Sequence, residues 1–371
     1  MDDDESDSTW INLGFCRKLV LARHHFQARL TDVFRCVPPH EAFVGWILSL
    51  CSSDSDGELD FDARDFPNLN PLLRFVQQRA CVSVDLVEAV NQFSIDMASF
   101  WNDCDCEIRR KEWLCAYTER DSIHLSYPDD LHEFNVPSAT LAELRAKHQG
   151  SCFARDVALL FMKYESLFGF GVGEGRGWQL SIPDAFYHFL ESEFQVCCEF
   201  FASPINRRCV YYFSLFSSDS AFGSLGNFFR SPPSLQGLLS LVGNPDHLTI
   251  EANPPFQPLV MMRFAKRFTR LLSEADDAGY GLLGVVILPH WPTCEPIEFL
   301  TNSPYLIHSV LLAKGEHKYK PGWADVEVFE ADPAYWKQSE TLILFLGSAK
   351  SRHMHSFMTD FEIRRTWSNT N

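Results

Sequence analysis

The chain has 371 residues, of which 46% are hydrophobic and 22% are charged, and its formal net charge is -17. A typical domain has about 150 residues, so this length predicts two domains. The negative charge excludes a protein that coats nucleic acid through bulk positive charge. The sequence has no run of about 18 apolar residues to span a bilayer, and it opens on the acidic MDDDESDS where a targeting peptide would be basic.

The twelve cysteines are scattered and lack the paired spacing of a structural zinc site. Their densest group is Cys104, Cys106 and Cys115, with His124 further along the chain. We therefore predict no metal site and mostly buried, reduced thiols, which are typical of cytosolic or nuclear proteins. Between these two compartments we predict the nucleus, with the cytoplasm kept as an alternative, and we expect no membrane association.

The first 150 residues predict an acidic, disordered tail over 1–9 and a mainly helical domain over 10–150. Apolar residues recur at helical spacing, and the predicted helices cover 10–34, 43–50, 71–100 and 138–147. Short strand-like pieces lie between 111 and 137. Ser138 is an acceptable N-cap for the last of these helices.

Beyond residue 150, short apolar segments alternate with helical patterns. Helices are predicted at DVALLFMKYESLF, PDAFYHFLESEF and PLVMMRFAKRFTRLL, and strands at QVCCEFFA, HLTIEA, YGLLGVVILP, YLIHSVLLAK, ADVEVFEA and TLILFLG. Apolar strands that alternate with helices are typical of a buried, mostly parallel sheet with helices on both faces. We therefore predict a doubly wound α/β domain over 151–371.

A glycine-rich loop, GFGVGEGRG, covers residues 169–177. Dinucleotide binding requires a strand before such a loop and a helix after it, whereas this loop follows a predicted helix. A flexible lid or a ligand-lining loop is the favoured interpretation, and NAD or FAD binding is the weaker alternative.

The most specific short pattern is Asn253-Pro254-Pro255-Phe256, which follows the predicted strand HLTIEA. Two prolines fix φ at successive positions and remove two ladder donors, so the carbonyls of this turn can point at a ligand. The Asn253 side-chain carbonyl and the Pro254 carbonyl can accept both hydrogens of one exocyclic amine, while Phe256 stacks on the attached ring. The alternative interpretation is a Pro-Pro turn without a catalytic role.

This tetrapeptide resembles the (D/N/S)PP(Y/F/W) motif of amino-methyltransferases. Those enzymes use S-adenosylmethionine to methylate adenine N6, cytosine N4 or a glutamine amide. Acceptors on both N–H groups restore nucleophilicity to the amine and align it, so positioning and electrostatics carry the rate. The sequence offers no convincing Ser/His/Asp or Cys/His set for another mechanism.

Further segments narrow the resemblance. In chain order they are CEFFASPIN, AFGSLGNF, EANPPF, VILPHW and GEHKYKPG, preceded by Lys163-Tyr164-Glu165 and by Glu174, Gly175, Gly177 and Gln179. Together they resemble the family of the phosphorylated CTD-interacting factor, the cap-specific adenosine N6-methyltransferase of messenger RNA. The resemblance covers roughly 155–350, and no amino-terminal WW module is recognised in the sequence.

The resemblance implies a class I, Rossmann-like methyltransferase domain behind a helical domain, with S-adenosylmethionine as the methyl donor. It implies catalytic roles for Asn253, Pro254, Pro255 and Phe256. The donor-binding residues that it implies are Gly175, Gln179, Ser203, Pro204, Asn206, Phe222, Gly223, Ser224 and Asn253. If QVCCEFFA and HLTIEA are neighbouring strands, the SPIN and NPPF loops face the same crevice.

Candidate substrate contacts follow the NPPF motif. Arg263, Lys266, Arg267 and Arg270 fall on one helical face. A solvated face is the ordinary interpretation. The sharper hypothesis is that these cations, together with Lys314, Lys318 and Lys320, hold the triphosphate bridge and RNA backbone of a capped end. Trp291 and Tyr319 are candidates for stacking on the cap or the adenine, and Glu316 and His317 belong to a matched segment.

The predicted partner is a capped RNA 5′ end that begins with adenosine, and DNA is not expected. The predicted activity is methylation of N6 of this first transcribed adenosine. Two alternatives stay open. One is an inactive cap-binding or RNA-binding subunit that keeps the enzyme fold, and the other is an adenine N6-methyltransferase acting on DNA or on internal RNA.

Overall fold

The computed structural model describes residues 114–117, 123–126, 136, 138–168, 180–230, 234–320, 340–352 and 360–368, with isolated helical positions at 25, 88, 92, 95, 96 and 99. The predicted acidic tail, most of the predicted helical domain, Gly175, Gln179 and the predicted strand ADVEVFEA lie outside these residues. The side chains of the Cys104 group lie outside them too. The chain divides into two compact units, one of Met1–Ala146 and Gly150–Arg176, the other of Lys147–Gln149 and Gly177–Asn371.

In the first unit, strands β1 (Leu114–Tyr117) and β2 (Ile123–Ser126) pair antiparallel. Helix α5 (Ser138–Lys147) is followed by α6 (Phe153–Phe168), so the helices predicted in these places are confirmed. Every residue of α6 from 157 to 165 is buried, which is typical of an interior helix. The Arg145 guanidinium lies 4.2 Å from the ring centre of Phe153 and connects the two helices through a cation–π contact.

The second unit is built on a six-stranded sheet with the order β4-β3-β5-β6-β8-β7. Its strands are β3 (Val196–Glu199), β4 (Tyr211–Tyr212), β5 (His247–Ala252), β6 (Gly281–Pro289), β7 (Leu306–Leu312) and β8 (Thr341–Gly347). Strand β8 runs antiparallel to both of its neighbours, and the other pairings are parallel. The predicted mostly parallel sheet is therefore confirmed, with β8 as its exception and the two-residue β4 as a strand that the sequence pattern did not indicate.

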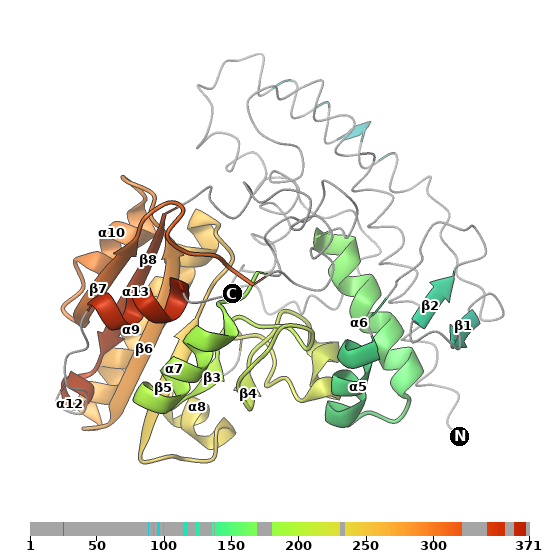
Figure 1. Cartoon of the computed structure of the whole chain (residues 1–371), viewed down its shortest axis with the longest axis horizontal. Helices are drawn as coiled ribbons and strands as arrows, with labels where there is room; N and C mark the ends of the chain where they lie inside the picture. The colour runs from blue at the N-terminus through green and yellow to red at the C-terminus, as the bar shows by residue number, and fades with distance from the viewer. Residues whose placement is uncertain are drawn as a thin grey trace. The chain divides into compact units, whose positions relative to one another are not determined.

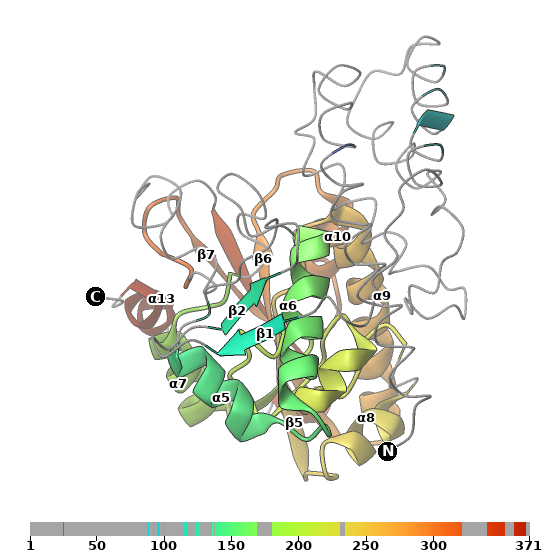
Figure 2. The same cartoon turned by 90° about the vertical axis from the view of Figure 1, so that its right-hand side faces the viewer.

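Helices cover both faces of this sheet (Figures 1 and 2). The second unit's helices are α7 (Asp184–Phe194), α8 (Leu235–Leu241), α9 (Pro258–Asp277), α10 (Glu295–Thr301), α12 (Ala349–Arg352) and α13 (Asp360–Ser368), with a 3₁₀ turn, η1, at Ser217–Phe222. Because strand side chains alternate, Leu248 and Ile250 of β5 join a core with α8, α9 and α10, whereas Val285 and Ile287 of β6 join a core with α7 and α13. The domain is a mixed α/β sandwich of three layers.

Of the described cysteines, Cys198 and Cys209 are buried, Cys197 and Cys294 are half-buried and Cys152 is exposed, so the predicted burial holds for only part of them. Within the ranges that the structure describes, no helix is both long enough and apolar enough to cross a bilayer. The same ranges contain no group of three His, Cys, Asp or Glu side chains that could hold a metal ion.

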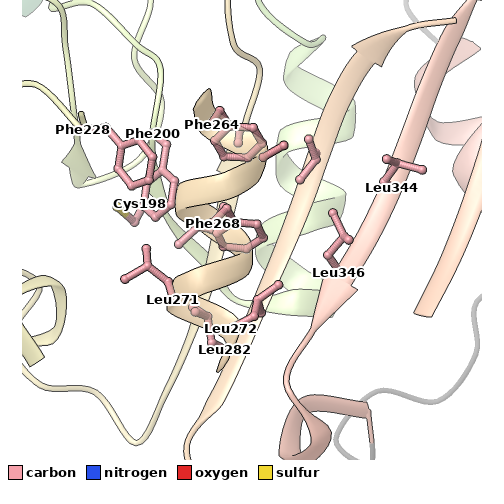
Figure 3. Packing of buried hydrophobic residues seen from close by; sticks show 14 of the residues in the cluster. Cys198, Phe200, Phe228, Phe264, Phe268, Leu271, Leu272, Leu282, Leu344 and Leu346 are labelled. Atoms are coloured by element: carbon pink, nitrogen blue, oxygen red, sulfur yellow. The ribbon is translucent and has the colours of Figure 1, made fainter. Parts of the chain in front are cut away.

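Aromatic rings fill the core between α9 and the sheet (Figure 3). Phe264 and Phe268 of α9 stack with ring centres 5.6 Å apart, and Phe200 and Phe228 stack at 4.2 Å. Gly284 of β6 makes room for this packing, because a Cβ atom at this position would lie 2.3 Å from the Phe268 ring. The close approach of α9 to β6 therefore depends on a glycine in the strand.

We predict that Gly284→Ala lowers the free energy of unfolding by about 1–3 kcal/mol, because the added methyl group overpacks the core against Phe268. Urea denaturation followed by circular dichroism measures this loss. Adding Phe268→Leu to Gly284→Ala frees space, so the double variant is expected to lose less stability than the sum of the two single variants. Strict additivity would show that the two side chains do not compete for the same volume.

Candidate functional site

The predicted site residues gather where the sheet changes its winding direction. Strand β4 lies on one side of β3 and β5 lies on the other. The chain therefore moves from β3 to one side to form β4, and then crosses to the other side of β3 to form β5. Ligands of doubly wound sheets bind at the carboxyl ends of strands at such a point. The Phe200 N–H donates to the Glu251 carbonyl at 3.0 Å, which keeps β3 and β5 paired until their loops leave. The predicted pairing of the strands at QVCCEFFA and HLTIEA is confirmed, and the SPIN and NPPF segments follow these two strands.

The NPPF turn presents two carbonyl groups in defined orientations. Asn253 Nδ2 donates to the Leu180 carbonyl at 3.3 Å, which assigns Oδ1 as the outward acceptor. The Pro255 carbonyl is used inside the turn, where it accepts the Gln257 N–H at 2.7 Å. Among the described residues, no backbone N–H donates to the Pro254 carbonyl. Asn253 Oδ1 and the Pro254 carbonyl therefore accept no hydrogen bond from the described residues, and Pro254 is buried.

Helix α9 begins directly after this turn, at Pro258. A proline in the first turn of a helix loses no hydrogen bond, since the first N–H groups have no partner within the helix. The fixed φ of Pro258 therefore starts the helix at a defined place and holds the end of the NPPF turn. The apolar face of α9 packs on the sheet, which anchors the turn at its other end.

The Phe256 ring contacts aromatic rings from two other loops of the second unit. Its ring centre lies 6.4 Å from that of Trp291 and 6.3 Å from that of Tyr319, both in edge-on geometry. Trp291 follows β6 and Tyr319 follows β7, so the loops after β5, β6 and β7 meet at Phe256. The structure thus brings together three aromatic residues that the sequence connected with base or cap recognition.

His317 and Tyr319 are internal side chains. His317 is 3% exposed and Tyr319 is 8% exposed. His317 Nε2 lies 2.7 Å from Thr341 Oγ1, and the Tyr319 hydroxyl lies 2.8 Å from the same atom. Burial lowers the pKa of His317, and burial raises the pKa of Tyr319. Glu316 lies at the surface, where it pairs with Arg364 at 2.8 Å.

The SPIN segment forms a turn closed by its own polar groups. Asn206 Oδ1 accepts the Ser203 N–H at 2.7 Å and the Ser203 hydroxyl at 2.9 Å. The Ser203 carbonyl accepts the Arg207 N–H at 3.0 Å. Ser203 and Pro204 are buried. These contacts fix the conformation of the turn at the end of β3.

The segment Phe222–Ser224 reaches the SPIN turn through strand β4. Gly223 ends η1 with a φ of +89°, a left-handed conformation that favours glycine. Ser224 Oγ lies 2.6 Å from Ser214 Oγ. One residue earlier, the Phe213 carbonyl accepts the Ala202 N–H at 2.9 Å. Those predicted donor residues that the structure describes therefore lie on three connected pieces of chain at the carboxyl ends of β3, β4 and β5.

The basic face of α9 packs against aromatic rings. The Arg263 guanidinium lies 5.0 Å from the ring centre of Phe229, and that of Arg267 lies 5.2 Å from the ring centre of Phe228. Arg267 Nη1 also donates to the Phe229 carbonyl at 3.0 Å. Burial lowers the pKa of Arg267, with smaller contributions from neighbouring arginines. Lys266, between them, is exposed.

Sequence reasoning missed a buried acidic cluster formed by Tyr187, Glu199 and Glu251. Glu199 and Glu251 stand in register on β3 and β5 and are 2% and 1% exposed. The Tyr187 hydroxyl donates to Glu199 and lies 3.4 Å from Glu251 Oε2. The sequence does contain one feature that could have indicated the cluster. Each of the apolar strands VCCE and HLTIEA has a glutamate at or near its end.

A hollow of about 410 Å³ lies elsewhere, between α9 and α10. It is lined by Thr269, Glu295, Glu298, Phe299, Asn302, Ser303 and Pro304. This lining includes none of the predicted site residues, and its two glutamates disfavour an anionic ligand. We therefore place the candidate site at the ends of β3, β4 and β5.

Comparison with known proteins identifies the family of the chain. The family model described as "Phosphorylated CTD interacting factor 1 WW domain" matches residues 137–322, which is half of the chain and includes the SPIN, NPPF and EHKY segments. The human "mRNA (2'-O-methyladenosine-N(6)-)-methyltransferase" is 31% identical over 198 residues, which cover 52% of this chain and 26% of the human protein. The mouse protein of the same name is 30% identical over 198 residues with the same coverage. The chain belongs to the phosphorylated CTD interacting factor 1 family.

Proposed function

We propose that the protein is an S-adenosylmethionine-dependent methyltransferase that methylates N6 of the first transcribed adenosine of capped RNA. The observation that carries the proposal is the NPPF turn, whose Asn253 Oδ1 and Pro254 carbonyl are left as acceptors at the switch point of the sheet. The names of the human and mouse relatives describe an activity of this kind. The matched segment is about a quarter of those proteins, at 26% of their length.

We propose a class I, Rossmann-like fold for the second unit. The supporting observation is the sheet order β4-β3-β5-β6-β8-β7 with β8 as the antiparallel strand. In this fold the donor site lies at the end of the first strand, here β3, and the acceptor motif follows the strand beside it, here β5. The first 150 residues are proposed to form the mainly helical domain that precedes it.

The proposed chemistry places two acceptors around one amine. An exocyclic amine is a weak nucleophile, because its lone pair is delocalised into the purine ring. Asn253 Oδ1 and the Pro254 carbonyl accept its two N–H groups and so favour the positive charge that develops on nitrogen during attack. Phe256 stacks on the base and holds the amine in line with the methyl group. Bound S-adenosylmethionine supplies an electrophilic methyl group on sulfur.

The donor is proposed to bind beside the SPIN turn. Ser203, Pro204 and Asn206 line the end of β3, and the segment Phe222–Ser224 lies next to them through the Ser214–Ser224 contact. The rigid Ser203–Asn206 turn supplies a fixed wall, since its polar groups already satisfy one another. Gly175 and Gln179, which lie outside the described residues, stay proposed donor-binding residues on the strength of the family resemblance.

We propose that the capped RNA lies along the aromatic and basic surfaces next to Phe256. Trp291 is half-buried against Phe256 and offers a stacking surface for a cap or base. Arg263 and Arg267 follow on α9 as cations for the phosphates, and their contacts with Phe228 and Phe229 hold them in fixed orientations. Glu316, His317 and Tyr319 support this side of the site. We also propose nuclear residence, which fluorescence microscopy of the tagged protein tests.

Asn253→Ala is expected to reduce methyl transfer by about 100- to 1,000-fold, because one of two positioned acceptors is lost. The measurement is transfer from labelled S-adenosylmethionine to a short capped RNA that begins with adenosine, with the modified nucleoside identified by mass spectrometry. Asn302→Ala, at an exposed position after α10, is the matched control and should retain wild-type activity.

The same assay separates the alternatives. Uncapped RNA, RNA with internal adenosine only, and DNA are offered beside the capped substrate. Stronger transfer to DNA or to internal adenosine would replace the proposed acceptor. No transfer to any acceptor, with retained RNA binding, would favour an inactive binding subunit.

Arg263→Gln is expected to raise KM for capped RNA with little change in kcat, because a phosphate contact contributes to binding rather than to the chemical step. Each lost phosphate contact also reduces the salt dependence of single-strand binding by about 0.7 in slope. Arg365→Gln removes the same charge from an exposed position on α13, on the opposite face of the sheet, and should change neither quantity. Equal effects of the two variants would assign the change to net charge alone.

A further inference from the structure

The acidic cluster of Tyr187, Glu199 and Glu251 lies inside the second unit, directly beneath the candidate site. Glu199 is the last residue of β3, and the SPIN turn begins four residues later. Glu251 is the last residue but one of β5, which ends at Ala252, and the NPPF turn begins at the next residue, Asn253. Tyr187 comes from α7, which covers this face of the sheet.

The two carboxyl groups have unequal surroundings. Glu199 Oε2 accepts the Arg208 N–H at 2.8 Å and the Cys209 N–H at 3.0 Å, while Glu199 Oε1 accepts the Tyr187 hydroxyl. Glu251 Oε2 lies 3.4 Å from the Tyr187 hydroxyl, and Glu251 Oε1 is buried without a hydrogen-bond partner. Three donors stabilise a negative charge on Glu199, whereas nothing comparable stabilises one on Glu251.

The other groups that face Glu251 do not compensate such a charge. The titratable and charged groups around the pair are Tyr187 from α7, Cys198 and Glu199 from β3, Arg208 and Cys209 from the segment before β4, Tyr212 from β4, and Tyr319 from the segment after β7. Strand β6 presents Val285 in register with Glu251. Burial raises the pKa of Glu251 well above its usual range, and the charge of Glu199 raises it further. Burial also raises the pKa of Glu199, but its three hydrogen bonds oppose the shift.

We propose that this cluster holds a single negative charge, on Glu199, with Glu251 as a neutral carboxylic acid, and that it positions the NPPF and SPIN segments for methyl transfer. The kinetic part of this inference rests on the proposed function. Glu251 shares its proton with the Tyr187 oxygen, and the Tyr187 hydroxyl donates to Glu199. The carboxylate of Glu199 in turn closes the loop that contains Ser203 and Asn206 by binding the N–H groups that follow it.

Ionisation of Glu251 breaks this arrangement. Two carboxylates would then stand in register on paired strands, without solvent between them. Because folding raises the pKa of Glu251, the stability associated with its neutral form is fully present below the unfolded-state pKa and is lost as pH rises through the folded-state value. Asn253 follows directly after β5, two residues beyond Glu251, so a change at the end of this strand reaches the NPPF turn. The three residues are thus positioning residues, with no contact to the reacting atoms.

The first test is spectroscopic and does not depend on activity. Glu251→Gln keeps the shape of the neutral acid and removes its proton. At neutral pH the infrared difference spectrum of wild type against Glu251→Gln should contain a carboxylic-acid C=O band from wild type. If the difference spectrum contains a carboxylate band from wild type and no carboxylic-acid band, Glu251 is ionised and the proposal is overturned.

The second test uses thermal unfolding as a function of pH. The Tm of wild type should fall as pH rises through the folded-state pKa of Glu251, whereas the Tm of Glu251→Gln should stay level over that interval. Thr249→Val is the matched control, because Thr249 is buried two residues earlier on the same strand face with a hydroxyl that also lacks a partner. This variant should keep the wild-type pH dependence, and an identical pH dependence in Glu251→Gln would contradict the proposal.

The third test examines positioning. Tyr187→Phe removes the hydroxyl between the two acids and should lower kcat by up to about 100-fold, since small misplacements of reacting groups have effects of this size. Glu251→Gln should retain kcat and extend activity to higher pH. Unchanged kcat in Tyr187→Phe would remove the positioning role. If the protein transfers no methyl group while the infrared and Tm results hold, the proposed function fails and the charge assignment stands.

Discussion

The parallel pairing of β3 with β5 is the interaction on which the site depends. These strands are separated by a long stretch of chain, and their pairing brings the SPIN and NPPF segments to one edge of the sheet. The last bond of the pair, from the Phe200 N–H to the Glu251 carbonyl, lies directly below both segments. Without this register, a methyl donor bound after β3 and a base bound after β5 would not lie next to each other. The proposed reaction therefore depends on the order and pairing of the strands.

The two faces of the sheet at this edge pack against two different hydrophobic cores. On one face, α9 carries stacked phenylalanines that pack against β6 through the space left by Gly284, and its first turn continues from the NPPF segment. On the other face, α7 covers the acidic cluster and α13 places Trp367 against Tyr319. Apolar packing on the first face fixes the position of α9. On the second face, the Tyr187 hydroxyl connects the ends of β3 and β5 through Glu199 and Glu251. The NPPF motif therefore follows a strand that is packed by aromatic rings on one face and held by hydrogen bonds on the other.

Much of the second unit could be predicted from the sequence, because its strands are short apolar runs between turn residues. HLTIEA, between Pro245-Asp246 and Asn253-Pro254, became β5 with the predicted bounds. The two-residue β4 has too few residues for a periodic signal. The acidic cluster was missed because the register of Glu199 with Glu251 is a property of strand pairing, and no local pattern encodes it. The burial of His317 and Tyr319 on Thr341 likewise depends on segments that meet only in the folded chain.

Methyl transfer at this site requires that the end of β3 binds a methyl donor. Isothermal titration of S-adenosylhomocysteine into the protein tests this most directly, with Asn206→Ala measured beside wild type. We predict one binding site per chain in wild type and weaker binding in the variant, because Asn206 Oδ1 fixes the SPIN turn through Ser203. A wild-type protein that binds no S-adenosylhomocysteine would contradict the account, as would binding that Asn206→Ala leaves unchanged.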